Sequence, residues 1–159
     1  MTLDNKPHFT GGCQCGAVRF HIEGQLGDAS ICHCRMCQKA FGNFYAPLVA
    51  VGKAKLTWRR KEPQRFQSSN HVKRGFCEKC GTPLTYEVSD KIALAIGTFD
   101  DLAAIKPTIQ WGVEKKLPYL EELTALPGFP TERDEKSHEF ARTMVSYQHP
   151  DHEVSDEPK

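Results

Sequence analysis

Seven cysteines in three tight groups are the residues whose types and spacing could do chemistry in this sequence. The groups are Cys13 with Cys15, then Cys32, Cys34 and Cys37, then Cys77 with Cys80. Thiolates this close together in a sequence are typical ligands of a shared zinc ion. Two closed sites of four thiolates each would need eight cysteines. One of two sites must therefore recruit another residue or stay open.

The third group has the composition of a zinc knuckle. Two residues separate Cys77 from Cys80, so both thiolates can point at one ion across a tight turn, and Gly81 permits a positive φ there. Cys13 and Cys15 need a partner pair, and the knuckle supplies it. Four thiolates around zinc leave no open position, so we predict that Cys13, Cys15, Cys77 and Cys80 form a structural zinc site.

The remaining trio is Cys32, Cys34 and Cys37. Three protein ligands plus one exchangeable ligand is the general form of catalytic zinc. Three thiolates and Zn²⁺ sum to a charge of −1, which suits holding a thiol substrate as thiolate better than making hydroxide from water. We therefore predict a second zinc ion with an open position, through which the trio takes part in catalysis.

Other interpretations of the cysteines remain open at this point. A histidine could close the second site: His33 is nearest, although it points away if its neighbours converge on the metal, and His21, His71 and His138 are possible from elsewhere. Disulfides are disfavoured by the odd cysteine count and the lack of a secretion signal. A thioredoxin-like redox pair would need a βαβ context, which the sequence does not show.

Bulk properties limit the class of protein. The chain has 159 residues, 39% hydrophobic and 26% charged, with a net charge of +1. One domain of ordinary size is expected, without strong attraction to nucleic acid or membrane. Its apolar runs are too short to span a bilayer, and the N-terminus lacks the apolar core of a signal peptide. We expect a cytoplasmic protein, in a compartment where reduced thiols favour metal ligation.

Short apolar runs between turn residues predict a mainly β domain with few short helices. The expected strands are 17–23, 29–32, 44–51, 56–60, 64–68, 73–76, 84–88, 92–97 and 109–113. The expected helices are 34–41, 100–105 and 132–147. The domain plan is an N-terminal extension at 1–10, a single zinc-binding domain at 11–147, and a disordered acidic tail at 148–159.

A basic segment invites two further interpretations. Residues 53–74 hold eight basic residues against one acid, Glu62, and Arg35 and Lys39 lie beside the second cysteine group. The segment is either a solvated face or a surface for substrate carboxylates. Together with Trp58 and Phe66, the segment could bind nucleic acid, so a nucleic-acid-binding zinc ribbon is one alternative function. A non-catalytic, zinc-stabilised carrier or sensor is another. The low net charge and the extra trio count against nucleic acid.

The cysteine groups with their flanks resemble the glutathione-dependent formaldehyde-activating (GFA) enzyme family, which is related to centromere protein V. The similar stretches are GCQCGAVRF at 12–20, CHCRMCQ at 32–38, FCEKCGTPL at 76–84, IGTFD at 96–100 and LPGF at 126–129. The resemblance runs from about residue 11 to residue 129, which is most of the chain.

The resemblance implies a β-tent fold of short antiparallel sheets held by zinc knuckles, with two zinc ions. The structural ion would lie on Cys13, Cys15, Cys77 and Cys80, and the catalytic ion on Cys32, Cys34 and Cys37. The implied activity is that of a carbon–sulfur lyase, which joins formaldehyde and glutathione reversibly as S-hydroxymethylglutathione. The implied partners are a small-molecule thiol and an aldehyde, and we expect neither a membrane nor a nucleic acid as partner.

Overall fold

The structure is a computed structural model that describes residues 6–154, and it confirms the predicted mainly β fold. Each of the expected strands has a counterpart. The strands are β1 (His8–Gly12), β2 (Arg19–Glu23), β3 (Ala29–Cys32), β4 (Ala46–Ala50), β5 (Lys55–Trp58), β6 (Gln64–Gln67), β7 (Val72–Phe76), β8 (Pro83–Val88), β9 (Lys91–Ala95) and β10 (Ile109–Trp111). The helical elements are α1 (Arg35–Phe41), η1 (Ile96–Thr98), η2 (Val113–Lys115), η3 (Leu120–Ala125) and α2 (Glu135–Thr143).

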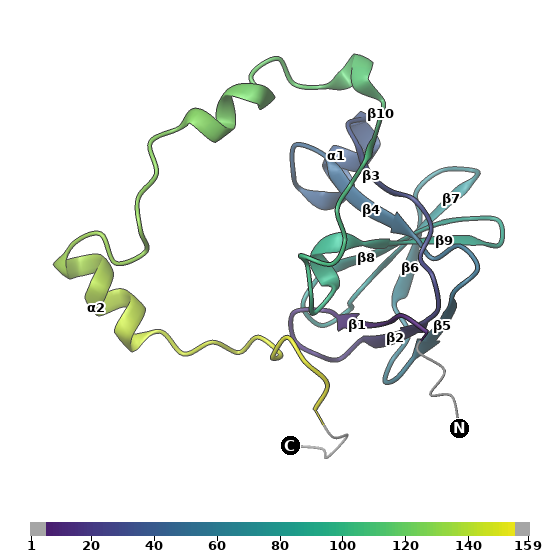
Figure 1. Cartoon of the computed structure of the whole chain (residues 1–159), viewed down its shortest axis with the longest axis horizontal. Helices are drawn as coiled ribbons and strands as arrows, with labels where there is room; N and C mark the ends of the chain where they lie inside the picture. The colour runs from purple at the N-terminus through teal and green to yellow at the C-terminus, as the bar shows by residue number, and fades with distance from the viewer. Residues whose placement is uncertain (1–5, 155–159) are drawn as a thin grey trace.

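Within residues 6–154 the strands form two sheets, visible together as one body in Figure 1. The smaller sheet has the order β1-β2-β5, and the larger has the order β10-β3-β4-β9-β8-β7-β6. Their pairs are antiparallel with one exception, because β10 runs parallel to β3. The parallel pair departs from the antiparallel pattern that the family resemblance implied. It arises because β10 reaches β3 by a crossover and not through a hairpin.

The main core joins the two sheets. In β2, Phe20 and Ile22 alternate with more polar residues and are fully buried, as a strand with one buried face requires. They pack with Val49 of β4, Leu94 of β9 and Phe99, which follows η1. Burial of this set removes large apolar side chains from water, and it fixes the sheets relative to each other.

The strand β1 was not expected from the sequence, and close packing explains it. An added Cβ at Gly11 would lie 2.3 Å from the backbone oxygen of Thr98 and 2.4 Å from Cζ of Phe20. Only glycine permits this approach of β1 to the segment after β9. The GG sequence therefore marks a contact between two backbones, although it carries no alternation that would predict a strand.

The predicted helix at 100–105 is wrong, because its first residue is engaged elsewhere. Both carboxylate oxygens of Asp100 accept from the guanidinium of Arg19, at 2.9 and 2.5 Å, and one also accepts from the Thr10 hydroxyl at 2.5 Å. The pair is about nine-tenths buried. Burial opposes ionisation, but the bonds from Arg19 and Thr10 outweigh it and lower the pKa of Asp100. Asp100 thus ties β1 to β2 instead of capping a helix. The other expected cap, Asp101, accepts from the Ala103 amide at 3.1 Å, but the backbone there forms a turn and no helix follows.

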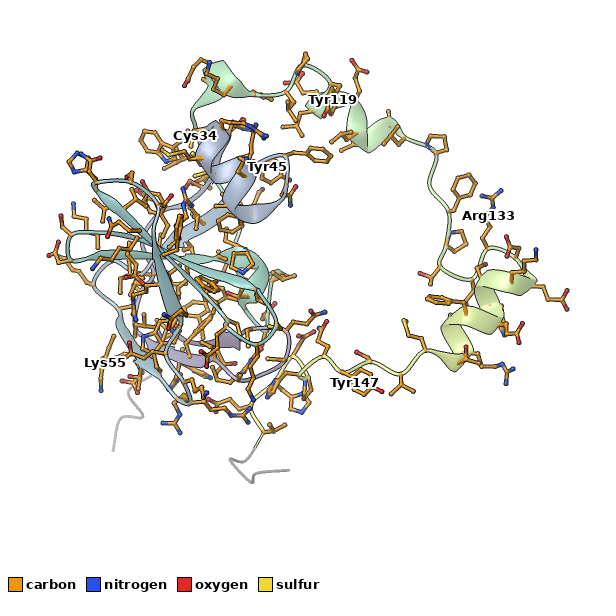
Figure 2. The ribbon with its side chains drawn as sticks, turned by 180° about the vertical axis from the view of Figure 1, so that it is seen from behind. Cys34, Tyr45, Lys55, Tyr119, Arg133 and Tyr147 are labelled. Atoms are coloured by element: carbon orange, nitrogen blue, oxygen red, sulfur yellow. The ribbon has the colours of Figure 1, made fainter. Side chains whose placement is uncertain are left out.

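Residues 116–147, here called the arm, leave the body and return to it. Figure 1 shows the arm as an open loop that carries η3 and α2, and Figure 2 shows Arg133 far out on it. The helix α2 lies inside the predicted 132–147 and begins with a capping box between Asp134 and Ser137. At the end of the arm, the His149 amide donates to the Gln14 carbonyl at 2.7 Å. Just before the arm begins, the Lys115 carbonyl accepts from Gln38 Nε2 of α1 at 3.3 Å, so the chain is anchored to the body at both ends of the arm.

The predicted domain limits remain predictions, and residues 1–5 and 155–159 lie outside the described part of the chain. Pairing of the N-terminal segment with the body begins at His8, before the predicted boundary at residue 11. At the other end, His149 is in contact with the body inside the predicted acidic tail. No helix within residues 6–154 is long and apolar enough to cross a membrane.

Candidate metal centres

The first and third cysteine groups form one cluster of four. Cys13 and Cys15 lie in the turn after β1, and Cys77 and Cys80 lie in the turn between β7 and β8. In each turn a glycine with positive φ follows the second cysteine, with φ of 74° at Gly16 and 76° at Gly81. The turns are joined because the Gln14 amide donates to the Thr82 hydroxyl at 3.1 Å. The local sequence therefore aims four sulfurs at one point.

The sulfur separations fit a metal site. The Sγ atoms of Cys13 and Cys15 are 3.6 Å apart, and those of Cys15 and Cys77 are 3.8 Å apart. A tetrahedral ion with metal–sulfur distances of about 2.3 Å sets sulfurs about 3.8 Å apart, whereas a disulfide needs about 2.05 Å. The described cysteines are all free thiols, so the four form a donor set for one metal ion.

The thiol environments within this cluster differ. Burial raises the pKa of Cys13 to about 12. Burial also opposes ionisation of Cys80, but the hydroxyl and backbone amide of Thr82 outweigh it and lower the pKa of Cys80 to about 6. The hydroxyl oxygen of Thr82 lies 3.1 Å from Cys80 Sγ. Because cysteine binds zinc as thiolate, metal binding at this cluster releases protons.

The second cysteine group forms a separate cluster of three. Cys32 ends β3, Cys34 is the N-cap of α1, and Cys37 lies in the first turn of that helix. Their sulfurs lie within 4.8 Å of one another, and no histidine or carboxylate of residues 6–154 joins them. Cys37 is buried while Cys32 and Cys34 are partly exposed. In Figure 2, Cys34 and Tyr45 lie close together at the end of the body near α1, and Tyr119 lies on the first part of the arm.

The histidines considered as a fourth ligand are placed elsewhere. His33 is fully buried, and its Nε2 donates to Gln110 Oε1 at 3.0 Å while its ring meets the Tyr45 ring edge-on. His21 stacks edge-on against His8, and His138 lies on the arm, paired with Glu132. His71 contacts Asn70. The trio is thus a three-thiolate donor set within the described residues.

The strand β10 fixes the backbone around the trio. The His33 amide donates to the Trp111 carbonyl at 2.8 Å. Gly112, with φ of 64°, approaches so closely that a Cβ there would lie 2.9 Å from the Cys34 amide nitrogen. A side chain at this position would push Cys34 away from its partners. The unexpected parallel pair of β10 and β3 therefore holds two of the three cysteines in place.

Sequence reasoning missed Arg74 as a functional residue and counted it only within the basic segment. The residue is 7% exposed, and its Nη2 donates to Cys37 Sγ at 3.4 Å. Burial raises the pKa of the Cys37 thiol, and Arg74 opposes that rise. The signal was available, because Arg74 and Val72 share the buried face of β7 while Lys73 between them is exposed.

The rest of the basic segment does not form an uninterrupted cationic surface. Lys61 pairs with Glu78 at 3.0 Å, and Arg65 pairs with both Glu62 and Glu87. Salt bridges of this kind match the solvated-face interpretation of the segment. They weaken the basis for the zinc-ribbon alternative, which relied on cations available to phosphates.

Comparison with known proteins adds a family match. A family model described as glutathione-dependent formaldehyde-activating enzyme matches residues 8–115. Among solved structures, a crystal structure of a Rhodobacter sphaeroides protein is similar at 22% identity, with a TM-score of 0.44, over 64% of this chain and 98% of that chain. The family match spans more than half of the chain and includes all seven cysteines.

Proposed function

This chain belongs to the glutathione-dependent formaldehyde-activating enzyme family, and from that premise we propose that it is a zinc-dependent protein of the carbon–sulfur lyase type. Its substrate is a thiol–aldehyde adduct such as S-hydroxymethylglutathione. In the forward direction the thiol S–H adds across the aldehyde C=O, so that a carbon–sulfur bond forms and the thiol proton passes to the aldehyde oxygen. The reverse step releases both partners.

The difference between the two donor sets is the observation that carries the proposal. Four thiolates meet in the first cluster, which satisfies a tetrahedral zinc ion, and three meet in the second. Cys32, Cys34 and Cys37 would hold the second ion and leave one position for a ligand from outside. Zinc bound there supplies positive charge that favours the thiolate form of a thiol at neutral pH.

The residues around the trio support this role through charge and position. Three thiolates with Zn²⁺ sum to −1, and the buried guanidinium of Arg74 brings the local total to zero. Arg74 also orients Cys37 through its hydrogen bond. The partial exposure of Cys32 and Cys34 gives an outside thiol a path to the trio. Holding the thiol and the aldehyde next to each other in a reactive orientation then supplies most of the rate acceleration.

Cobalt substitution tests the proposal. Cobalt-loaded protein should show thiolate-to-metal absorption that changes when glutathione is added and again when formaldehyde follows. The Cys34→Ser variant should lose that response but keep the bands of the four-cysteine cluster. A spectrum of the unmodified protein that stays unchanged with thiol would refute an open position. Exchange rates between adduct and free reactants, measured by NMR above the uncatalysed background, then separate a lyase from a carrier or sensor.

A further inference from the structure

Tyr86 of β8 lies on the same face of the larger sheet as Arg74 of β7. The two residues are register partners in the antiparallel pair of these strands, so their side chains project to the same side. The guanidinium of Arg74 lies over the Tyr86 ring, 5.0 Å from its centroid. Because Nη2 of Arg74 also donates to Cys37 Sγ, the Tyr86 ring is tied to the three-cysteine cluster.

Tyr86 also packs beside the trio directly. It is partly buried against the small core cluster that contains Cys37, and Cys32 and Cys34 pack against the same cluster. Burial raises the pKa of Tyr86, the charges of the three thiolates raise it further, and Arg74 opposes the rise. All three sulfurs therefore lie close enough to act on the phenol group, which stays protonated at neutral pH.

The Tyr86 hydroxyl is a hydrogen-bond donor that no other residue uses. It makes no hydrogen bond within residues 6–154, and its side chain is only half-buried. Other donors near the trio are occupied or enclosed. Nε2 of His33 is already bonded, and Arg74 bonds to Cys37 and Ser68 through Nη2 and Nε, while its Nη1 has no exposed surface. Tyr86 therefore offers a donor to a small ligand beside the trio.

The proposed reaction needs a donor at one atom. As the carbon–sulfur bond forms, the aldehyde C=O opens and negative charge builds on its oxygen before the thiol proton arrives there. We propose that the Tyr86 hydroxyl donates a hydrogen bond to this oxygen, both in the aldehyde and in the hydroxymethyl group of the adduct. Tyr86 keeps its own proton, so the balance is unchanged: the thiol S–H adds across the C=O. This inference rests on the proposed function and makes Tyr86 a catalytic residue of that site.

Tyr86→Phe tests the assignment, because it removes the hydroxyl and keeps the ring over which Arg74 lies. The rate of exchange between adduct and free reactants, measured by NMR above the uncatalysed background, should fall about 100-fold, as on loss of one donor of this kind. The cobalt response to glutathione should persist, because the trio holds the thiol. Tyr45→Phe is the matched control: Tyr45 lies close to Cys34 in Figure 2, but its ring packs against His33, so the rate should change by less than about twofold.

Binding supplies a readout that does not depend on turnover. In zinc-loaded protein labelled with ¹³C at tyrosine Cζ, the Tyr86 resonance is identified by its loss in Tyr86→Phe. S-hydroxymethylglutathione, formed by mixing glutathione with formaldehyde, should shift this resonance, because its hydroxyl oxygen accepts from the phenol. S-ethylglutathione carries a methyl group in place of that hydroxyl, and it should produce a clearly smaller shift.

The outcomes separate this inference from the proposed function. An unchanged exchange rate in Tyr86→Phe, or equal shifts from the two glutathione derivatives, would overturn the role of Tyr86 and leave the function standing. Loss of the glutathione response in Tyr86→Phe at unchanged metal content would also overturn it, because the hydroxyl would then serve the thiol and not the aldehyde oxygen. A cobalt spectrum of the unmodified protein that ignores glutathione would refute the proposed function, and this inference with it.

Discussion

The two cysteine clusters should contribute unequally to stability, and the chain offers a matched pair of variants to measure this. Cys13 with Cys15, and Cys32 with Cys34, have the same Cys-x-Cys spacing. Replacing Cys13 and Cys15 with serine removes the expected metal-mediated cross-link to Cys77, which is 62 residues from Cys15. Replacing Cys32 and Cys34 with serine removes metal-mediated cross-links that span at most the five positions from Cys32 to Cys37. This variant keeps Cys37 as the hydrogen-bond partner of Arg74.

Loop closure gives the magnitude. A cross-link across 62 residues removes about 4 kcal/mol of chain entropy from the unfolded state, and one across five positions removes about 2 kcal/mol. For a chain of this size, 1 kcal/mol corresponds to about 2–4 °C in Tm. The Cys13→Ser/Cys15→Ser variant should therefore melt about 8–16 °C below the unmodified protein, and the Cys32→Ser/Cys34→Ser variant about 4–8 °C below it. Each should lose one zinc ion.

Thermal unfolding followed by circular dichroism measures the decrease in Tm of each variant, and elemental mass spectrometry measures how many zinc ions each retains. A variant of the first pair that does not fold at all agrees with the reasoning, because structural zinc can supply more free energy than a domain's whole stability. Equal losses for the two pairs, or a larger loss for the second, would refute the idea that the four-cysteine cluster is the structural one.

Three further results are expected. Asp100→Asn should lower the free energy of unfolding by about 3–5 kcal/mol at neutral pH, because Arg19 is left buried without its counter-charge. Folding lowers the pKa of Asp100, so the stabilisation from the pair is lost as pH falls through that pKa. The difference in Tm between the variant and the unmodified protein should therefore shrink below about pH 4. Gly11→Ala should lower stability by about 1–3 kcal/mol in urea denaturation through overpacking, while Gly97→Ala, with no atom within 4 Å of the new Cβ, should change it by less than about 0.5 kcal/mol. Limited proteolysis should cut first within the arm, at 120–147, and leave the two sheets resistant; early cuts in β7 or β8 would contradict this.

Much of the site could be predicted because, for metal ligands that are close in sequence, the spacing alone largely determines whether they can meet at one ion. The groups around Cys34 and Cys80 each span six residues or fewer, so their spacing alone indicated convergence. The pairing of the first group with the third followed from counting sulfurs, and the structure brings those four together. The metal's identity and the site roles of the individual cysteines remain predictions.

Two of the features that the sequence did not predict depend on contacts between distant segments, and a third was missed in the pattern of one strand. β1 pairs with β2 because Gly11 lets two backbones meet, and no periodicity reports such a contact. The helix expected at 100–105 is absent because the carboxylate of Asp100 bonds to Arg19, 81 residues away in sequence. Arg74 was grouped with surface cations because its inward position is visible only from the alternation of β7. Local propensity gave way to tertiary contacts at Gly11 and at Asp100.

The separation of the two cysteine clusters along the chain also sets an order of assembly during synthesis. All three sulfurs of the trio leave the ribosome within six consecutive residues, 32–37, so a metal ion can be captured there early. Cys13 and Cys15 are translated first of all, yet they must wait for Cys77 and Cys80 before their site exists. The nascent protein thus carries an unmatched pair of thiols while the 61 residues between Cys15 and Cys77 are translated, out of 159 in all. The four-cysteine cluster, which we predict to be the structural one, is the last to be completed.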